Sequence, residues 1–126
     1  MTDCRYRHAI DLFNEREFFA CHDVLEEIWA ETLGTEREFY QGLIHAAVSL
    51  FHFEEGNLGG ARKMYDSTVR YLSPYRPRCL GVDVDAFLRD YEDCFSELLG
   101  PHTGYPDGVV LNPDLIPCIE WNGMVT

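Results

Sequence analysis

The sequence has few basic residues and no long apolar run. Lysine and arginine together number 10, against 22 aspartates and glutamates, which gives a formal net charge of −12. A charge of this sign repels phosphate backbones and anionic lipid surfaces, so we expect no nucleic acid and no membrane as partners. No run approaches the roughly 18 apolar residues of a membrane span. The N-terminus also lacks the apolar core of a signal peptide, so the sequence predicts a cytoplasmic protein.

Paired cysteines are also missing. The five cysteines are odd in number and widely spaced, and none of them forms a CxxC pair. A disulfide framework is typical of an even number of cysteines and a zinc ribbon of CxxC pairs, so we expect reduced thiols, with Cys21 and Cys94 at core-like helical positions. With 46% apolar residues in a chain of 126, there is enough apolar surface for one packed domain.

Several motifs that would identify an enzyme do not occur. The HExxH motif of zinc proteases is absent, as are the glycine-rich motifs GxGxxG and GxxxxGK(S/T) of nucleotide-binding proteins. No histidine follows a glutamate by three residues, which excludes the Glu-x-x-His ligands of a di-iron bundle. The sequence therefore predicts none of these enzyme classes.

Apolar residues recur at helical spacing and predict an all-α protein, an antiparallel bundle of about five helices. The third segment is apolar almost all round, which is typical of the buried centre of a bundle. Thr35 with Glu38 matches a capping box, and Asn57 and Asp83 are expected N-caps. No stretch before Gly100 alternates like a strand. The expected helices, with their caps, cover residues 6–14, 17–32, 36–55, 57–72 and 83–99.

The sequence changes character after the expected bundle domain of residues 1–100. Residues 101–126 contain four prolines and three glycines, which exclude a further helix. They also contain Val109, Leu111, Ile119 and Trp121, which make the segment too apolar for a free tail. We expect an irregular segment packed on the bundle, which closes a groove or mediates formation of a homo-oligomer.

The most informative motif lies in the second expected helix. His22 and Glu26 are four residues apart and therefore neighbours on one helix face, and Trp29 lies nearly in line with them. A histidine and a carboxylate directed toward a core are costly unless they are paired or bound. Such a pair can bind a divalent metal ion or act as an acid–base unit. The alternative is a structural pair in which Glu26 accepts a hydrogen bond from His22.

A polar stripe on the third expected helix offers further candidates. Gln41, His45, Ser49 and His52 lie within about 80° of one another on an otherwise apolar helix. The stripe either faces solvent or lines an internal site. The two histidines are seven residues apart, about 10.5 Å of helix rise, which makes ligation of one ion by both awkward. Gln41 and His45 are candidate ligand-binding residues, as is Trp29.

A glycine-rich stretch opens the fourth expected helix. Glycines in a first helical turn suggest close approach to a neighbour, and a helix N-terminus favours anions. Arg62 is therefore a candidate anion-binding residue beside Gly59 and Gly60. Salt bridges within the protein are the alternative explanation for Arg62.

Two stretches of the sequence resemble a known family. They read FNEREFFACHDVLEEIWAE and FYQGLIHAAVSLFHFEEGNLGGARKMY, and the likeness covers about residues 12–72. Both are similar to domain of unknown function 309, a family marked by an HxxxExxW motif that His22, Glu26 and Trp29 match. The resemblance implies a small helical bundle and a metal-binding role for the motif, without an established activity.

We therefore expect a polar pocket built on His22, Glu26 and His52 and walled by Trp29, with a divalent metal ion as cofactor. The resemblance implies glutamine at the position of His45, so His52 is the preferred third ligand. A metal-bound water would make metal-dependent hydrolysis the natural reaction. The alternative is a non-enzymatic interaction module, in which the motif residues form a structural hydrogen-bond network and the partner is a protein.

Overall fold

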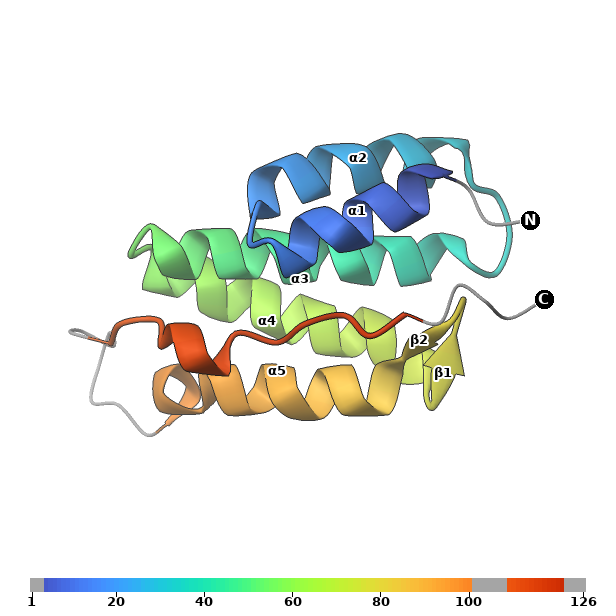
Figure 1. Ribbon diagram of the computed structural model, residues 1–126. Helices are drawn as coiled ribbons and strands as arrows, with labels where there is room; N and C mark the ends of the chain where they lie inside the picture. The colour runs from blue at the N-terminus through green and yellow to red at the C-terminus, as the bar shows by residue number, and fades with distance from the viewer. Residues whose placement is uncertain (1–3, 101–108, 122–126) are drawn as a thin grey trace.

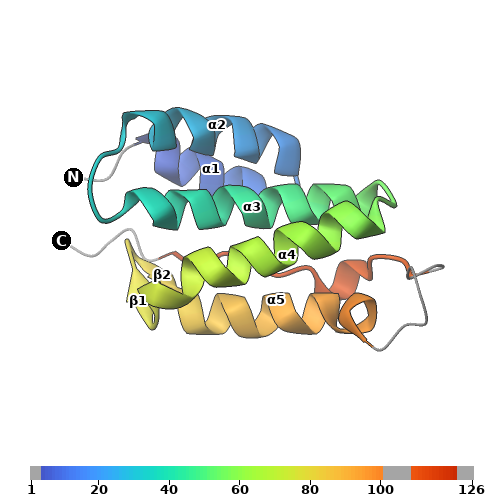
Figure 2. The same cartoon turned by 180° about the vertical axis from the view of Figure 1, so that it is seen from behind.

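The structure is a computed structural model that describes residues 4–100 and 109–121. Its main elements are five α-helices, which confirms the predicted all-α class. Figure 2 shows α2, α3, α4 and α5 one below another, and in Figure 1 helix α1 lies in front of α2 and α3. The helices are α1 (Cys4–Asn14), α2 (Phe18–Glu31), α3 (Arg37–Glu54), α4 (Leu58–Leu72) and α5 (Val84–Leu99).

Two of the three predicted helix caps are confirmed. The Asn57 side chain accepts a hydrogen bond from the Gly60 amide at 3.0 Å, and Asp83 accepts one from the Ala86 amide at 2.9 Å. The capping box of Thr35 is wrong, because α3 begins after Glu36 without a side-chain cap. Residues 34–36 instead form a turn before the helix, and the Thr35 carbonyl accepts a hydrogen bond from Tyr75.

Helix α3 is the centre of the bundle, as its apolar sequence predicts. It packs against α2 on one side and α4 on the other. The approach of α4 is closest at Gly42, where a Cβ atom would lie 2.5 Å from Leu72 Cδ2. Its buried apolar side chains are Phe39, Leu43, Ile44, Ala46, Ala47, Leu50 and Phe53.

Two short strands precede Gly100, although no stretch there alternates like a strand. The short strands β1 (Arg78–Cys79) and β2 (Val82–Asp83) pair antiparallel between α4 and α5. Leu80 and Gly81 connect them with φ values of 47° and 82°, the positive values that a tight hairpin turn of two residues requires. Two-residue strands are too short to show alternation, and Leu-Gly is a weak turn signal.

The C-terminal segment packs against the bundle over its described residues, 109–121. In Figure 1 it runs between α1 and α5, and its single turn of 3-10 helix, η2 (Pro113–Leu115), lies beside α5. Asn14 at the end of α1 donates to the Ile119 carbonyl at 3.0 Å and accepts from the Ile119 amide at 2.7 Å. Trp121 forms an antiparallel bridge with Val82. The remaining residues of 101–126 lie outside the described part of the chain.

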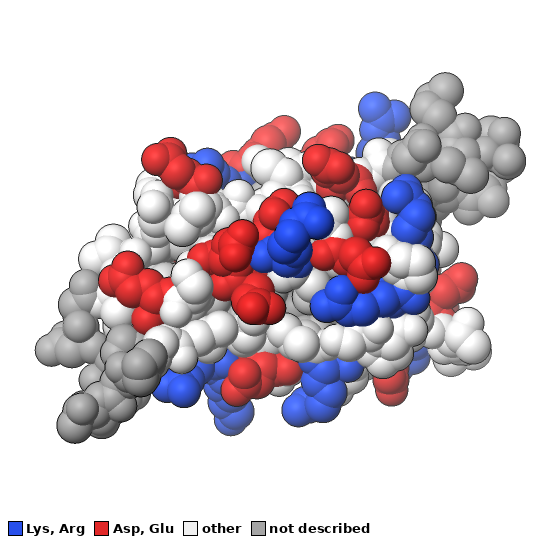
Figure 3. Space-filling model, turned by 90° about the horizontal axis from the view of Figure 1, so that it is seen from below, with Lys and Arg blue, Asp and Glu red and all other residues white. Residues whose placement is uncertain are grey.

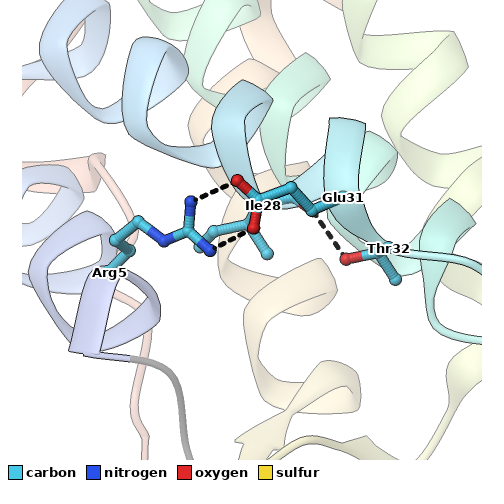
Figure 4. A network of polar contacts seen from close by, with 4 residues as sticks. All are labelled: Arg5, Ile28, Glu31 and Thr32. Atoms are coloured by element: carbon cyan, nitrogen blue, oxygen red, sulfur yellow. Dashed lines mark hydrogen bonds and ion pairs between the residues drawn. The ribbon is translucent and has the colours of Figure 1, made fainter.

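Ion pairs lie on the surface of the bundle. Arg5 on α1 makes two hydrogen bonds to the Glu31 carboxylate on α2, at 2.8 and 2.9 Å (Figure 4). On the face seen in Figure 3, acidic side chains are interspersed with basic ones.

All five cysteines are free thiols, and Cys21 and Cys94 are buried as expected. None of the described helices is both long and apolar enough to span a membrane.

The two hydrogen bonds between the Asn14 side chain and the Ile119 backbone, here called the Asn14 clamp, give a first test of the fold. Replacing Asn14 with alanine removes both hydrogen bonds to Ile119, so the free energy of unfolding should fall by about 1–3 kcal/mol. Hydrogen exchange at the Ile119 amide should accelerate at the same time, because that amide loses its acceptor. Unchanged exchange at Ile119 in Asn14→Ala would show that the clamp does not hold the segment in place.

The close approach at Gly42 gives a second test. Alanine is the better helix former by about 0.5–1 kcal/mol, but its methyl group would overlap the buried Leu72 side chain. Overpacking of a core costs about 1–3 kcal/mol, so Gly42→Ala should lower the free energy of unfolding in a denaturant titration. A variant more stable than the parent would mean that α3 and α4 are not in close contact there.

Candidate functional site

The motif residues of α2 form a compact polar group. The His22 ring has a carboxylate beside each nitrogen: Glu26 Oε1 lies 3.3 Å from Nε2, and Asp23 Oδ1 lies 3.3 Å from Nδ1. The His22 side chain is 22% exposed, whereas those of Asp23 and Glu26 are 58% and 53% exposed. The imidazole is therefore half-buried, and the two carboxylates reach into solvent around it.

The same three residues offer a set of metal ligands. One ligand atom from each of His22, Asp23 and Glu26 lies within 4.8 Å of the others. One imidazole nitrogen with two carboxylate oxygens is a donor set suited to divalent ions such as Zn²⁺ or Mn²⁺. An ion bound there would replace one of the contacts that His22 makes with a carboxylate. Asp23 was missed in the sequence because it stands next to His22 rather than one turn away.

On its other side His22 borders an apolar pocket between α2 and α3. The pocket has a volume of about 150 Å³. The Phe19 ring lies 5.6 Å from the rings of both His22 and Phe51, tilted by 47° and 54°. The lining residues are Phe18, Phe19, His22, Val48, Phe51 and His52. The sequence alone did not identify the pocket, although Phe18 and Phe19 stand one helical turn before His22.

His52 lines this pocket and is also linked to the cap of α4. Its Nδ1 lies 3.3 Å from Asn57 Nδ2. The orientation of the Asn57 amide is set by its oxygen, which accepts the Gly60 amide hydrogen. Asn57 therefore donates to His52 Nδ1, so neutral His52 carries its own hydrogen on Nε2. Among the described residues, the three-ligand group at His22 does not extend to His52.

Trp29 lies outside the residues that line the pocket. The Arg37 guanidinium stacks over its ring, 3.9 Å from the centroid, in a cation–π contact between α2 and α3. Trp29 thus packs at the opposite end of α2 from Phe18. The third residue of the motif joins two helices rather than touching the pocket.

The polar stripe of α3 is divided among several environments. Ser49 is fully buried and lies 2.6 Å from the hydroxyl of Tyr91 on α5, which also donates to Thr68 on α4 at 3.2 Å. Burial raises the pKa of Tyr91, so this phenol stays protonated and can donate. Ser49 therefore belongs to a hydroxyl network in the core, away from His22.

Gln41 and His45 interact with each other, not with the site on α2. Gln41 Nε2 and His45 Nε2 are 2.7 Å apart, and the Tyr71 ring of α4 lies 5.2 Å from the His45 ring. His45 Nδ1 is buried without a hydrogen-bond partner. Burial, and next the charge of Arg70, lower the pKa of His45, which favours its neutral form.

Arg62 is exposed on the outer side of α4. In the adjacent first turn, the Gly60 amide already donates to Asn57, so this amide is used by the cap of the helix. One of the donors on which anion binding there would depend is therefore occupied.

The chain has identifiable relatives. Residues 6–64 match the family model described as "Domain of unknown function (DUF309)". The uncharacterized protein YpuF of Bacillus subtilis (strain 168) is 32% identical over 94 residues, which cover 72% of this chain and 54% of YpuF. An uncharacterized protein of Aquifex aeolicus (strain VF5) is 41% identical over 46 residues, 36% of this chain and 14% of that protein.

The chain spans about half the length of YpuF and a smaller share of the Aquifex protein. Neither name assigns an activity. The match of the family model includes His22, Glu26 and Trp29, the residues from which the resemblance was predicted. The comparison therefore confirms the predicted resemblance to the DUF309 family over residues 6–64.

Proposed function

We propose that this protein binds a divalent metal ion through His22, Asp23 and Glu26. The observation that carries the proposal is the proximity of their ligand atoms, all within 4.8 Å of one another. The negative charge of the two carboxylates attracts a cation, and the half-buried imidazole gives the site a fixed wall. Because the three residues stand on one turn of α2, little chain entropy is lost when they bind the ion.

The reaction class that fits this donor set is metal-assisted hydrolysis. When bound, the ion would supply Lewis acidity and lower the pKa of a coordinated water. Glu26 is placed to ligate or to accept a proton, since its carboxylate is more than half exposed and lies beside His22. The apolar pocket on the other side of His22 would hold part of a substrate away from water.

His52 has a different part in this proposal from the one that the sequence suggested. Ligation through Nε2 would require His52 to lose the hydrogen that the Asn57 contact assigns to that nitrogen. We therefore propose that His52 lies at the pocket without ligating the ion, with Asp23 in its place as the third ligand.

The second candidate function is a non-enzymatic interaction module, and the packing of Trp29 favours it. Arg37 stacks on Trp29 at 3.9 Å, and His22 already has a carboxylate beside each ring nitrogen. The three motif residues can thus fix the arrangement of α2 without an ion. Phe19, which is 58% exposed, would then be part of a surface for a protein partner.

Calorimetric titration of chelator-treated protein with Zn²⁺ and Mn²⁺ tests the metal proposal. We expect one ion per chain, no stoichiometric binding in His22→Ala, and affinity roughly tenfold weaker or worse in Glu26→Gln. Glu27→Gln is the matched control, because it removes the same charge from an exposed neighbour on α2 and should keep the ion. If Glu26→Gln and Glu27→Gln lose the same affinity for the ion, the effect comes from the net negative charge of α2 and not from ligation by Glu26.

Thermal unfolding without metal distinguishes the two candidate functions. The metal proposal predicts that His22→Ala changes the melting temperature little in chelator, because its partners Asp23 and Glu26 remain solvated when the imidazole is removed. The interaction module predicts a marked fall in chelator and no effect of added Zn²⁺ on the parent protein. The latter pair of results would contradict the metal proposal.

A further inference from the structure

The pocket between α2 and α3 is built almost entirely from rings. Five of its six lining residues, Phe18, Phe19, His22, Phe51 and His52, carry an aromatic side chain, and Val48 completes it. Phe18 is 2% exposed and packs on Phe13, 5.2 Å away, so the floor of the pocket is anchored in the core. Phe19, in contrast, is 58% exposed and stands at the mouth. Such walls favour a flat, apolar occupant.

The volume of the pocket limits the size of that occupant. At about 150 Å³ it matches the size of an engineered protein cavity that holds one benzene molecule. A bicyclic or long-chain group would extend into solvent. The apolar part of the ligand is therefore about one six-membered ring in size.

The polar residues at the pocket restrict the charge of the ligand. No lysine or arginine is among the lining residues, and the carboxylates of Asp23 and Glu26 lie beside His22. These carboxylates disfavour an anion. The surface that the lining residues expose to the pocket is almost wholly apolar, so an ammonium group would lose its hydration there without gaining a partner. A neutral ligand therefore fits best.

We infer that this pocket binds a small neutral compound with a single ring, such as an aryl amide, with its ring between Phe18, Phe19 and Phe51 and its polar group toward solvent at the mouth. The inference goes beyond the proposed metal site and does not require the ion, since His22 is the one lining residue that belongs to the group of metal ligands.

Four probes of matched structure test the inference on the metal-free full chain. Benzamide is the neutral probe, benzoate and benzylammonium share its ring but carry opposite charges, and acetamide has the amide without the ring. Two-dimensional NMR titration suits a ligand of this size, for which millimolar affinity is expected at about this number of atoms. We expect benzamide to shift the amide signals of the pocket residues in a saturable way, and to bind at least roughly tenfold tighter than each of the other three probes.

Pocket variants confine the effect to this place. Val48→Phe fills the pocket and should abolish benzamide binding, whereas Val24→Phe makes the same change at a half-buried position of α2 that does not line it. Because Phe19 is exposed, Phe19→Leu gives a further wall variant with little risk to folding.

Several results would overturn the inference. Preference for benzoate or benzylammonium would assign the pocket to a charged ligand, and equal binding of acetamide would remove the ring from recognition. Benzamide binding that survives in Val48→Phe would place the probe elsewhere. The inference also fails if none of the probes gives a saturable shift. A negative zinc titration, in contrast, would remove the proposed metal site and leave these measurements on metal-free protein unaffected.

Discussion

The burial of α3 is the constraint on which the rest of the structure depends. The helix packs against α2 on one side and α4 on the other, and at Gly42 it leaves no room for even a methyl group beside Leu72. A helix enclosed in this way has little contact with water. Each polar side chain on it must therefore find a partner in the protein or reach the surface at an end of the helix, because an unpaired buried polar group is costly.

This requirement explains why the polar stripe of α3 does not form one site. Ser49, in the middle of the bundle, is satisfied by the Tyr91 hydroxyl and the Ala46 carbonyl. His45 is paired through one ring nitrogen only, and its lowered pKa reflects the burial of the ring. His52, near the end of the helix, meets the cap of α4. Residues that share one face in a helical projection thus enter different environments.

Helix α2 lies at the outside of the bundle, and its position gives His22 two neighbourhoods. One side of the ring meets the exposed carboxylates of Asp23 and Glu26, and the other borders the apolar pocket. The proposed metal site and the proposed ligand pocket both follow from this border position of one histidine.

The sequence by itself determined whatever depends on the geometry of one helix. It predicted the five helices, the caps at Asn57 and Asp83, the central place of α3, and the adjacency of His22 and Glu26, because helical spacing and capping bonds act over a few residues. It also carried the resemblance to domain of unknown function 309, which the family match confirmed over residues 6–64.

Only the tertiary structure decided how the helix faces meet, because periodicity defines an apolar face but not the rotation of one helix against its neighbour. That rotation brought Phe18, Phe19 and Phe51 around one pocket and turned Ser49 toward Tyr91. The sequence also did not predict contacts between distant segments. For example, Asn14 donates a hydrogen bond to Ile119, 105 residues away in sequence. The same holds for the Thr35 carbonyl, which accepts a hydrogen bond from Tyr75, 40 residues away in sequence.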